Sequence, residues 1–381
     1  MKLYVARHGQ TQWNAENKVC GRTDLPLTEV GIAQAEALAE KASGLKMQCE
    51  DGGVYHKLTS QFHADFLMPE EDLLQFYAYD VSSLAVADFC ASMALSARVY
   101  KKYDADFANK MAVAAKKAWA WLEANPEAVL FWNPRNSGTG EYGDGTDKDE
   151  RLWAAVEMFY LAKELGKDTD TYKKSALSII KEGIPLIDFG WTDVAGFASL
   201  AVLSDSEKAM GEEVYNICRT AVLTEADRLL ELCKLNAFDM GMEPIDFCWG
   251  SNMVVTNRGI LWSLAYELTG EAAYAEAVLS HVDYLFGKNI TNYSYVTGCG
   301  ENAYKHPHSR PLQMDDVEEP VPGLVSGGAN GHPGDPAACK LLPPGTAPMK
   351  CFVDVWESYS TNEITIYWNS SAIYTTAFLR R

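Results

Sequence analysis

The feature that most constrains the fold is a series of long segments in which apolar residues recur every three or four positions. Such spacing places the apolar side chains on one face of an α-helix. The clearest examples lie in residues 107–122, 152–159, 214–233, 261–268 and 278–285. Loops rich in Gly, Pro and Asp separate these segments, and the loops at 133–149 and 320–350 are longer than ordinary connections. The sequence therefore predicts a mainly α-helical array or toroid with elaborate loops on one face.

The first residues follow a different pattern. Residues 2–6 are short and β-prone, and a polar loop rich in Asn and Gly follows them. Thr28 is a suitable helix N-cap. Apolar residues then recur at helical spacing through Ile32, Ala35, Leu38, Ala39 and Ala42. We therefore expect a short strand, a loop and a helix at the N-terminus.

The net charge of −19 excludes several kinds of partner. Nucleic acid and anionic membranes both favour basic surfaces, so neither is expected to bind. A neutral polysaccharide is compatible with this charge, although acidity can also serve solubility alone. The chain holds 10 Trp and 19 Tyr. Their rings suit stacking on sugars, and they suit core packing equally well.

The nine cysteines are scattered, and no Cys-x-x-Cys pair occurs. We therefore expect neither a zinc site nor a thioredoxin-type motif, but free thiols in a reducing compartment. The N-terminus does not resemble a secretory signal, and no apolar run approaches the ~20 residues that span a bilayer. As written, the chain is expected to be cytoplasmic.

Residues 1–44 carry a first resemblance to a known family. They contain the stretches LYVARHGQTQWN and CGRTDLPLTEVGIAQAEALA, which resemble the beginning of the phosphoglycerate mutase-like histidine phosphatases. The resemblance implies that His8 accepts a phosphoryl group while Arg7 and Arg22 hold its oxygens. No later segment matches the rest of that family's site. Because catalytic groups act as a unit, we interpret residues 1–44 as an inert fragment, with phosphoryl transfer through His8 as an alternative.

Two C-terminal stretches carry a second resemblance. The first is SYVTGCGEN at 294–302, which leads through KHP to His308, Ser309 and Arg310. The second combines FVD at 352–354 with Tyr359, the pair Asn362-Glu363 and WNS at 368–370. Together they resemble the two signatures of the family 9 glycoside hydrolases, the cellulase (endo-β-1,4-glucanase) family. The resemblance covers Leu45 to Arg381, so we predict one truncated catalytic domain over 45–381.

This second resemblance implies roles for three residues. Glu363 matches the general acid that protonates the leaving glycosidic oxygen, and His308 and Arg310 match residues that contact the sugar beside the scissile bond. An extended backbone would place His308 and Arg310 on the same face. A carboxyl group acts as an acid near neutral pH only where a shielded site raises its pKa. The neighbouring aromatic residues Tyr359 and Trp368 fit that need.

Other parts of the chain resemble cleft loops of the same family. The resemblance implies six substrate-binding candidates, namely Trp153, Trp191, Trp249, Asp354, Tyr359 and Trp368. It also implies four candidates for a calcium site, namely Asp147, Asp149, Glu150 and Asp193. Calcium prefers several oxygen ligands, although a solvated acidic loop explains these residues equally well. The expected reaction requires no cofactor, and calcium is the one candidate metal.

The implied fold is an (α/α)6 toroid that is incomplete at its N-terminus, because the resemblance begins inside a barrel helix. The helix after Thr28 is a candidate to replace the last lost helix. Family members invert the anomeric centre, and their catalytic base comes from an Asp-Ala-Gly-Asp-type motif that this sequence lacks.

We therefore predict a hydrolase of cellulose-type β-1,4-glucan chains or oligosaccharides, with low or no turnover unless another carboxylate faces Glu363. The alternative is a β-glucan-binding protein without activity. Members of the family are usually secreted, in contrast to the expectation from the N-terminus of this chain.

Overall fold

The computed structural model describes residues 28–29 and 47–380. The strand and loop predicted near the N-terminus, and nearly all of the helix predicted after Thr28, lie outside the described residues. So do Arg7, His8 and Arg22, together with the proposed replacement of a lost barrel helix.

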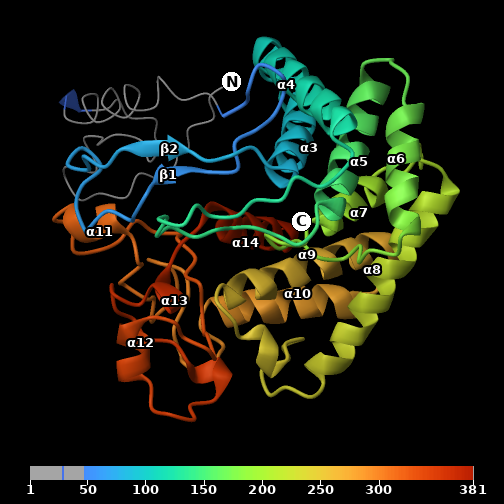
Figure 1. Cartoon of the computed structure of the whole chain (residues 1–381). Coiled ribbons are helices and arrows are strands. Elements are labelled where there is room, and N and C mark those ends of the chain that lie inside the picture. The colour runs from blue at the N-terminus through green and yellow to red at the C-terminus, as the bar shows by residue number, and fades with distance from the viewer. Residues whose placement is uncertain (1–27, 30–46, 381) are drawn as a thin grey trace. The chain divides into compact units, whose positions relative to one another are not determined.

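The described chain is mainly helical, as predicted (Figure 1). Its long helices are α3 (Ser83–Tyr100), α4 (Ala105–Ala124), α5 (Lys148–Glu164), α6 (Asp170–Lys181), α7 (Ala195–Leu203), α8 (Glu212–Cys233), α9 (Ser251–Thr269), α10 (Ala272–Leu285) and α14 (Ile366–Phe378). Its shorter elements are β1 (Leu58–Ser60), β2 (Phe76–Ala78), α11 (Arg310–Met314), α12 (Pro336–Leu341), α13 (Tyr359–Asn362) and two 3-10 turns at Pro244–Asp246 and Pro348–Lys350.

The chain divides into two compact units. The first unit contains the residues up to Asp65 together with Pro69–Cys218, and the second contains Phe66–Met68 and everything from Arg219 onward. Helix α8 begins in the first unit and ends in the second.

The first unit combines a small hairpin with helices α3 to α7. Strands β1 and β2 pair antiparallel, with Leu58 opposite Ala78. Helix α3 packs against α4 and α5, and α5 packs against α6 and α7. Ser82 and Asp104 cap the starts of α3 and α4, because each side chain accepts a backbone N–H of the first turn. The alanine-rich inner faces of α3 and α4, including Ala91, are buried and allow the helices to lie close together.

The core of the second unit lies around α9, which packs against α10 and α14. Gly259 permits the close approach of α14, because a Cβ at this position would lie 2.5 Å from Cγ2 of Thr375. The largest fully buried side chains of this unit are aromatic: Trp262, Tyr284, Tyr295 and Tyr304. The Nε1 of Trp262 donates a hydrogen bond to the carbonyl of Ala226 at 3.0 Å, so its one polar atom is satisfied.

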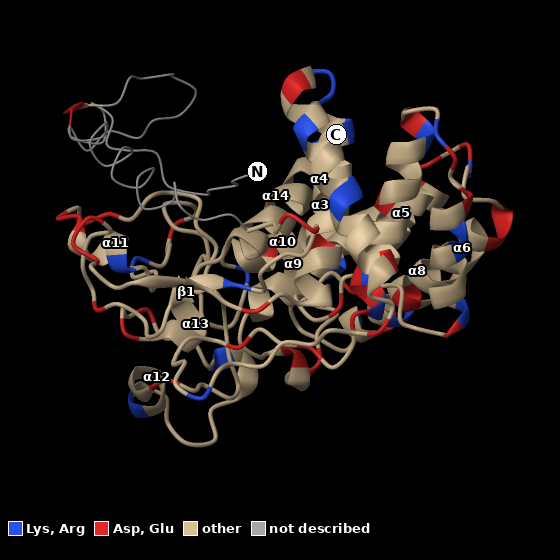
Figure 2. Cartoon of the chain, turned by 45° about the horizontal axis from the view of Figure 1, so that its top comes forward, with Lys and Arg blue, Asp and Glu red and all other residues tan. Residues whose placement is uncertain are grey.

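A long irregular region separates α10 from α14 and contains the short helices α11, α12 and α13 and the 3-10 turn at Pro348–Lys350. This region carries Glu363. Asp and Glu residues are interspersed with Lys and Arg in the view of Figure 2, and many form surface ion pairs such as Lys163–Glu207. Within the described part of the chain, no helix is long and apolar enough to cross a membrane.

Candidate active site

Glu363 follows directly after α13 and is held by its backbone. Its carbonyl accepts the N–H of Gly327 at 2.9 Å, and the residue forms a parallel bridge with His308. The side chain is half-buried and points at an aromatic residue, because the Nε1 of Trp249 donates to its Oε2 at 2.9 Å. Three segments that lie far apart in the sequence therefore position one carboxyl group.

The pKa of the Glu363 carboxyl is raised above its ordinary value. Burial raises it, while the hydrogen bond from Trp249 and the positive charge of Arg310 lower it by less. Burial disfavours the charged form of a carboxyl group, so Glu363 retains its proton to a higher pH than an exposed glutamate. This is the electrostatic property that a general acid needs.

His308 lies beside the acid with a defined orientation. Its backbone N–H donates to the carbonyl of Asn362 at 2.8 Å, and its Nδ1 lies 2.6 Å from the carbonyl oxygen of Trp356. A carbonyl only accepts, so we assign the proton of the neutral ring to Nδ1, which leaves Nε2 as an acceptor. Burial and the charge of Arg310 lower the pKa of His308, although the Trp356 carbonyl opposes them. The neutral form is therefore favoured.

Arg310 is connected to His308 through Phe66. The Arg310 guanidinium lies 5.8 Å from the centre of the Phe66 ring, and the same ring meets His308 edge-on at 5.5 Å. Both His308 and Arg310 therefore lie near Glu363, as expected for members of one site. Sequence reasoning missed Phe66 because no motif marks it, and its place depends on a chain segment far from the signatures.

Two of the predicted substrate-binding residues lie next to the acid. The ring of Trp249 is 46% exposed and lies 5.5 Å from that of Tyr359 at an interplanar angle of 32°. Tyr359 in turn meets His308 edge-on at 5.7 Å. Partly exposed aromatic rings beside an acid are suited to contact the apolar faces of sugars.

Trp368 has a different position from the one that its predicted role requires. It is only 3% exposed, and its ring packs against Gly250 and Gly327. A Cβ at Gly250, whose φ is 83°, would lie 2.9 Å from the ring. Because the side chain is enclosed by the backbone around it, Trp368 is a core residue rather than a surface for sugar.

The carboxyl group of Asp354 is engaged in hydrogen bonds within the protein. Its two carboxyl oxygens accept the backbone N–H groups of Lys305 and His306, each at 2.9 Å, and the His306 ring forms an ion pair with it at 3.1 Å when protonated. These contacts fix the segment that leads to His308. The geometry therefore favours a supporting role for Asp354 over the predicted contact with substrate.

Trp153 and Trp191 belong to the first unit. Trp191 is 50% exposed, and Tyr142 meets it edge-on at 6.5 Å. Trp153 stacks on Phe197 at 5.0 Å. The exposed ring of Trp191 remains suited to contact a sugar, and the roles of both residues stay predictions.

The four calcium candidates do not form a shared set of ligands. Asp147 is engaged in an ion pair with Arg151 at 2.7 Å, and Oδ2 of Asp149 accepts the N–H of Val194 at 2.8 Å. Asp193 accepts the hydroxyl of Thr192. Among the residues that the structure describes, no group of three or more His, Cys, Asp or Glu side chains is arranged to hold a metal ion.

Glu150 is the one calcium candidate with a free buried oxygen. Its Oε2 is buried without a hydrogen-bond partner. Burial, together with the neighbouring Asp88 and Asp149, raises the pKa of Glu150 to about 10. Asp147 is already paired with Arg151 and Asp149 with the N–H of Val194, so the described side chains, as they are arranged, do not fit a calcium ion.

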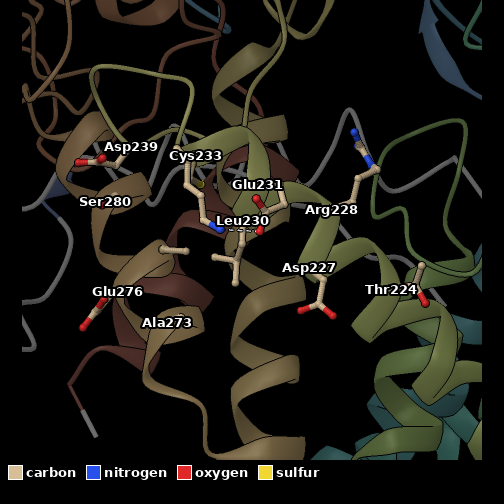
Figure 3. A pocket seen from close by; sticks show the side chains of 12 residues that line it. Thr224, Asp227, Arg228, Leu230, Glu231, Cys233, Asp239, Ala273, Glu276 and Ser280 are labelled. Atoms are coloured by element: carbon tan, nitrogen blue, oxygen red, sulfur yellow. Dashed lines mark hydrogen bonds and ion pairs between the residues drawn. The ribbon is translucent and has the colours of Figure 1, made fainter.

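One groove of the second unit is separate from this site. It has a volume of about 920 Å³ and is lined by the C-terminal half of α8, by α10 and by Asp239 (Figure 3). Side chains of both charges surround it, among them Asp227, Arg228 and Glu276. None of the residues predicted to act on a substrate lines this groove.

A half-buried carboxyl group with a raised pKa, flanked by a cation and by exposed aromatic rings, defines a site of the glycoside hydrolase type. Comparisons with known proteins agree. The sequence model of the Glycosyl hydrolase family 9 matches residues 37–376, so the chain belongs to this family.

Individual relatives support the assignment. A cellodextrinase from Butyrivibrio fibrisolvens is 41% identical over 349 residues, which cover 89% of this chain and 63% of the relative. The solved structure of AaCel9A in complex with cellobiose-like isofagomine has a TM-score of 0.82 and 34% identity over 96% of this chain and 67% of its own. The predicted family 9 toroid is thereby confirmed, and the chain spans less than two thirds of the cellodextrinase.

The N-terminus matches a second family. The model of the histidine phosphatase superfamily (branch 1) matches residues 3–51, and a probable phosphoglycerate mutase from Cronobacter sakazakii is 43% identical over 60 residues, 16% of this chain and 25% of the relative. The first resemblance is thus also confirmed. The two family matches overlap at residues 37–51, and the predicted domain boundary after residue 44 falls inside this overlap.

Proposed function

We propose that this chain hydrolyses β-1,4-glucan chains or their oligosaccharides, with Glu363 as the general acid. The raised pKa of Glu363, combined with its contact to the exposed ring of Trp249, is the observation that carries the proposal. The cellodextrinase relative and the family 9 structure with a cellobiose-like ligand support this substrate class.

The hydrogen bond from Trp249 determines which oxygen of Glu363 carries the proton. Oε2 accepts from the indole N–H, so the proton to be transferred resides on Oε1. After the transfer, the Trp249 N–H and the charge of Arg310 stabilise the carboxylate that forms. His308 offers Nε2 to a sugar hydroxyl, and the rings of Trp249 and Tyr359 contact the sugar faces.

We expect the rate to be low. An inverting enzyme needs a second carboxylate about 6.5–9.5 Å from the acid to activate water. The sequence contains no Asp-Ala-Gly-Asp motif to supply it. Loss of a general base costs roughly 10²–10⁴-fold in rate.

The missing motif also favours a second candidate function, which is β-glucan binding without turnover. The exposed ring of Trp249 and the orientation of His308 do not depend on a base. Binding would therefore persist where the chemistry is absent.

One pair of measurements distinguishes these functions. Reducing-sugar release from a soluble β-glucan is compared among the wild type, Glu363→Gln and the control Glu301→Gln, which alters an exposed carboxyl group. Binding of cellotetraose to each protein is measured by calorimetry. The hydrolase predicts release that only Glu363→Gln abolishes, whereas a binding protein shows heat of binding without release. Absence of both release and binding would contradict both functions.

A further inference from the structure

The acid is attached to a helix that is too short to maintain its own geometry. Helix α13 has four residues, and its N-cap Ser358 makes no side-chain bond to the helix backbone. Isolated helices of this length are unstable in water. The position of Glu363 therefore depends on contacts from outside α13.

A fully buried carboxylate supplies these contacts. Asp335 is 0% exposed, and its Oδ2 accepts the hydroxyl of Ser358 at 3.0 Å, the N–H of Ser360 at 3.1 Å and the hydroxyl of Ser360. Its Oδ1 accepts the N–H of Ala338 at 2.7 Å and so caps α12. One side chain thereby ties α12 to the start of α13 through four hydrogen bonds.

A movement of α13 would disturb the whole site at once. The ring of Tyr359 lies between Trp249 at 5.5 Å and His308 at 5.7 Å. Glu363 comes directly after the helix, and its bond to Trp249 is 2.9 Å long. A displacement of 1 Å would lengthen this bond beyond normal range.

We propose that Asp335 is a positioning residue for the general acid, because it holds α13 so that Glu363 keeps its bond to Trp249 and its direction toward the glycosidic oxygen. The inference rests on the proposed role of Glu363. The position of the carboxyl group, however, can be measured without turnover.

Two variants and one control separate positioning from simple stabilisation. Asp335→Asn keeps the shape of the side chain but replaces one carboxyl oxygen by an amide NH2 group. The donors that face this group lose their acceptor. Ser360→Ala removes one donor on the side of α13 and keeps the cap of α12. The control is Ser263→Ala, which removes a buried hydroxyl of α9 that donates to the carbonyl of Gly259 at 2.7 Å, within its own helix.

The decisive readout is the indole ¹H–¹⁵N resonance of Trp249, identified by its absence in Trp249→Phe. Its dependence on pH reports the protonation of Glu363, whose other charged neighbour is Arg310. We expect the pH-dependent shift to shrink in Asp335→Asn and Ser360→Ala and to stay at the wild-type size in Ser263→Ala. In kinetics, kcat of Asp335→Asn should fall on the order of 100-fold with little change in KM.

The two proposals fail in different ways. A wild type without hydrolysis but with a normal indole titration contradicts the proposed function and leaves the placement of Glu363 measurable. An identical titration in all three variants overturns the role of Asp335, whatever the activity. If Asp335→Asn does not fold, the titration of Ser360→Ala alone tests the role of Asp335, because this variant removes only one of the four hydrogen bonds that the Asp335 side chain accepts.

Discussion

Replacing Trp249 by phenylalanine tests the hydrogen bond on which the acid depends. The variant keeps an aromatic ring for the sugar, although a smaller one, and removes the N–H that donates to Oε2 of Glu363 at 2.9 Å. A hydrogen bond to a charged group contributes about 1.5–3 kcal/mol. Because Trp249 is 46% exposed, water replaces part of this contribution, so we expect the lower end. A loss of about 1.4 kcal/mol corresponds to about a tenfold decrease in kcat.

The same variant should also shift the pH profile of kcat in one direction. The bond from Trp249 lowers the pKa of Glu363, so its removal raises that pKa and keeps the acid protonated to higher pH. The basic limb of the kcat profile should therefore move to higher pH. We would measure kcat on cellotetraose and on a p-nitrophenyl cellobioside, whose leaving group needs little protonation. The decrease should be smaller on the second substrate.

Trp132→Phe is the matched control, because Trp132 is an exposed tryptophan of the first unit. A kcat of Trp249→Phe within twofold of the control, or a basic limb that moves to lower pH, would refute the reasoning.

Three further predictions concern stability. His281 has its pKa lowered by burial from 6.5 to about 3, so the unfolded chain binds a proton that the folded chain does not. Denaturation midpoints should fall as the pH drops from about 6.5 toward 3, and less steeply in His281→Phe; parallel slopes would contradict this. Gly259→Ala should cost about 1–3 kcal/mol because its Cβ meets Thr375, whereas Gly145→Ala, in open space, should not; equal melting temperatures would exclude close packing of α9 and α14. A calcium chelator should leave the melting temperature unchanged. If the chelator lowers the melting temperature and added calcium reverses this decrease, the chain has the calcium site after all.

The long helices were predictable because their signal is local. The periodic segment at 107–122 falls within α4, the one at 152–159 within α5, and the one at 214–233 within α8. Each pattern can be read from residues that are close in the sequence, because a helix with one buried face repeats apolar residues every three or four positions. The segments at 261–268 and 278–285 fall within α9 and α10, and Gly270, with a φ of 74°, ends α9 between them.

The use of individual side chains within the site was less predictable. Trp249 and Trp368 both lie in stretches that match the family, yet one is exposed and the other is in the core. The difference comes from Gly250 and Gly327, which make room for the Trp368 ring. Likewise, Asp354 faces the N–H groups of residues that are 48 and 49 positions away. No local pattern contains such information.

The hydrogen bond between Trp249 and Glu363 has a consequence for folding. It joins residues that are 114 positions apart, and the chain between them also contributes His308 and Gly327 to the backbone of the acid. Contacts of such large sequence separation close late, because the entropy of a long loop must be overcome first. Helices α9 and α10 can therefore form well before the acid reaches its place. A protease cut in the irregular region between α10 and α13 would leave every long helix uncut and still remove the covalent connection between the acid and Trp249.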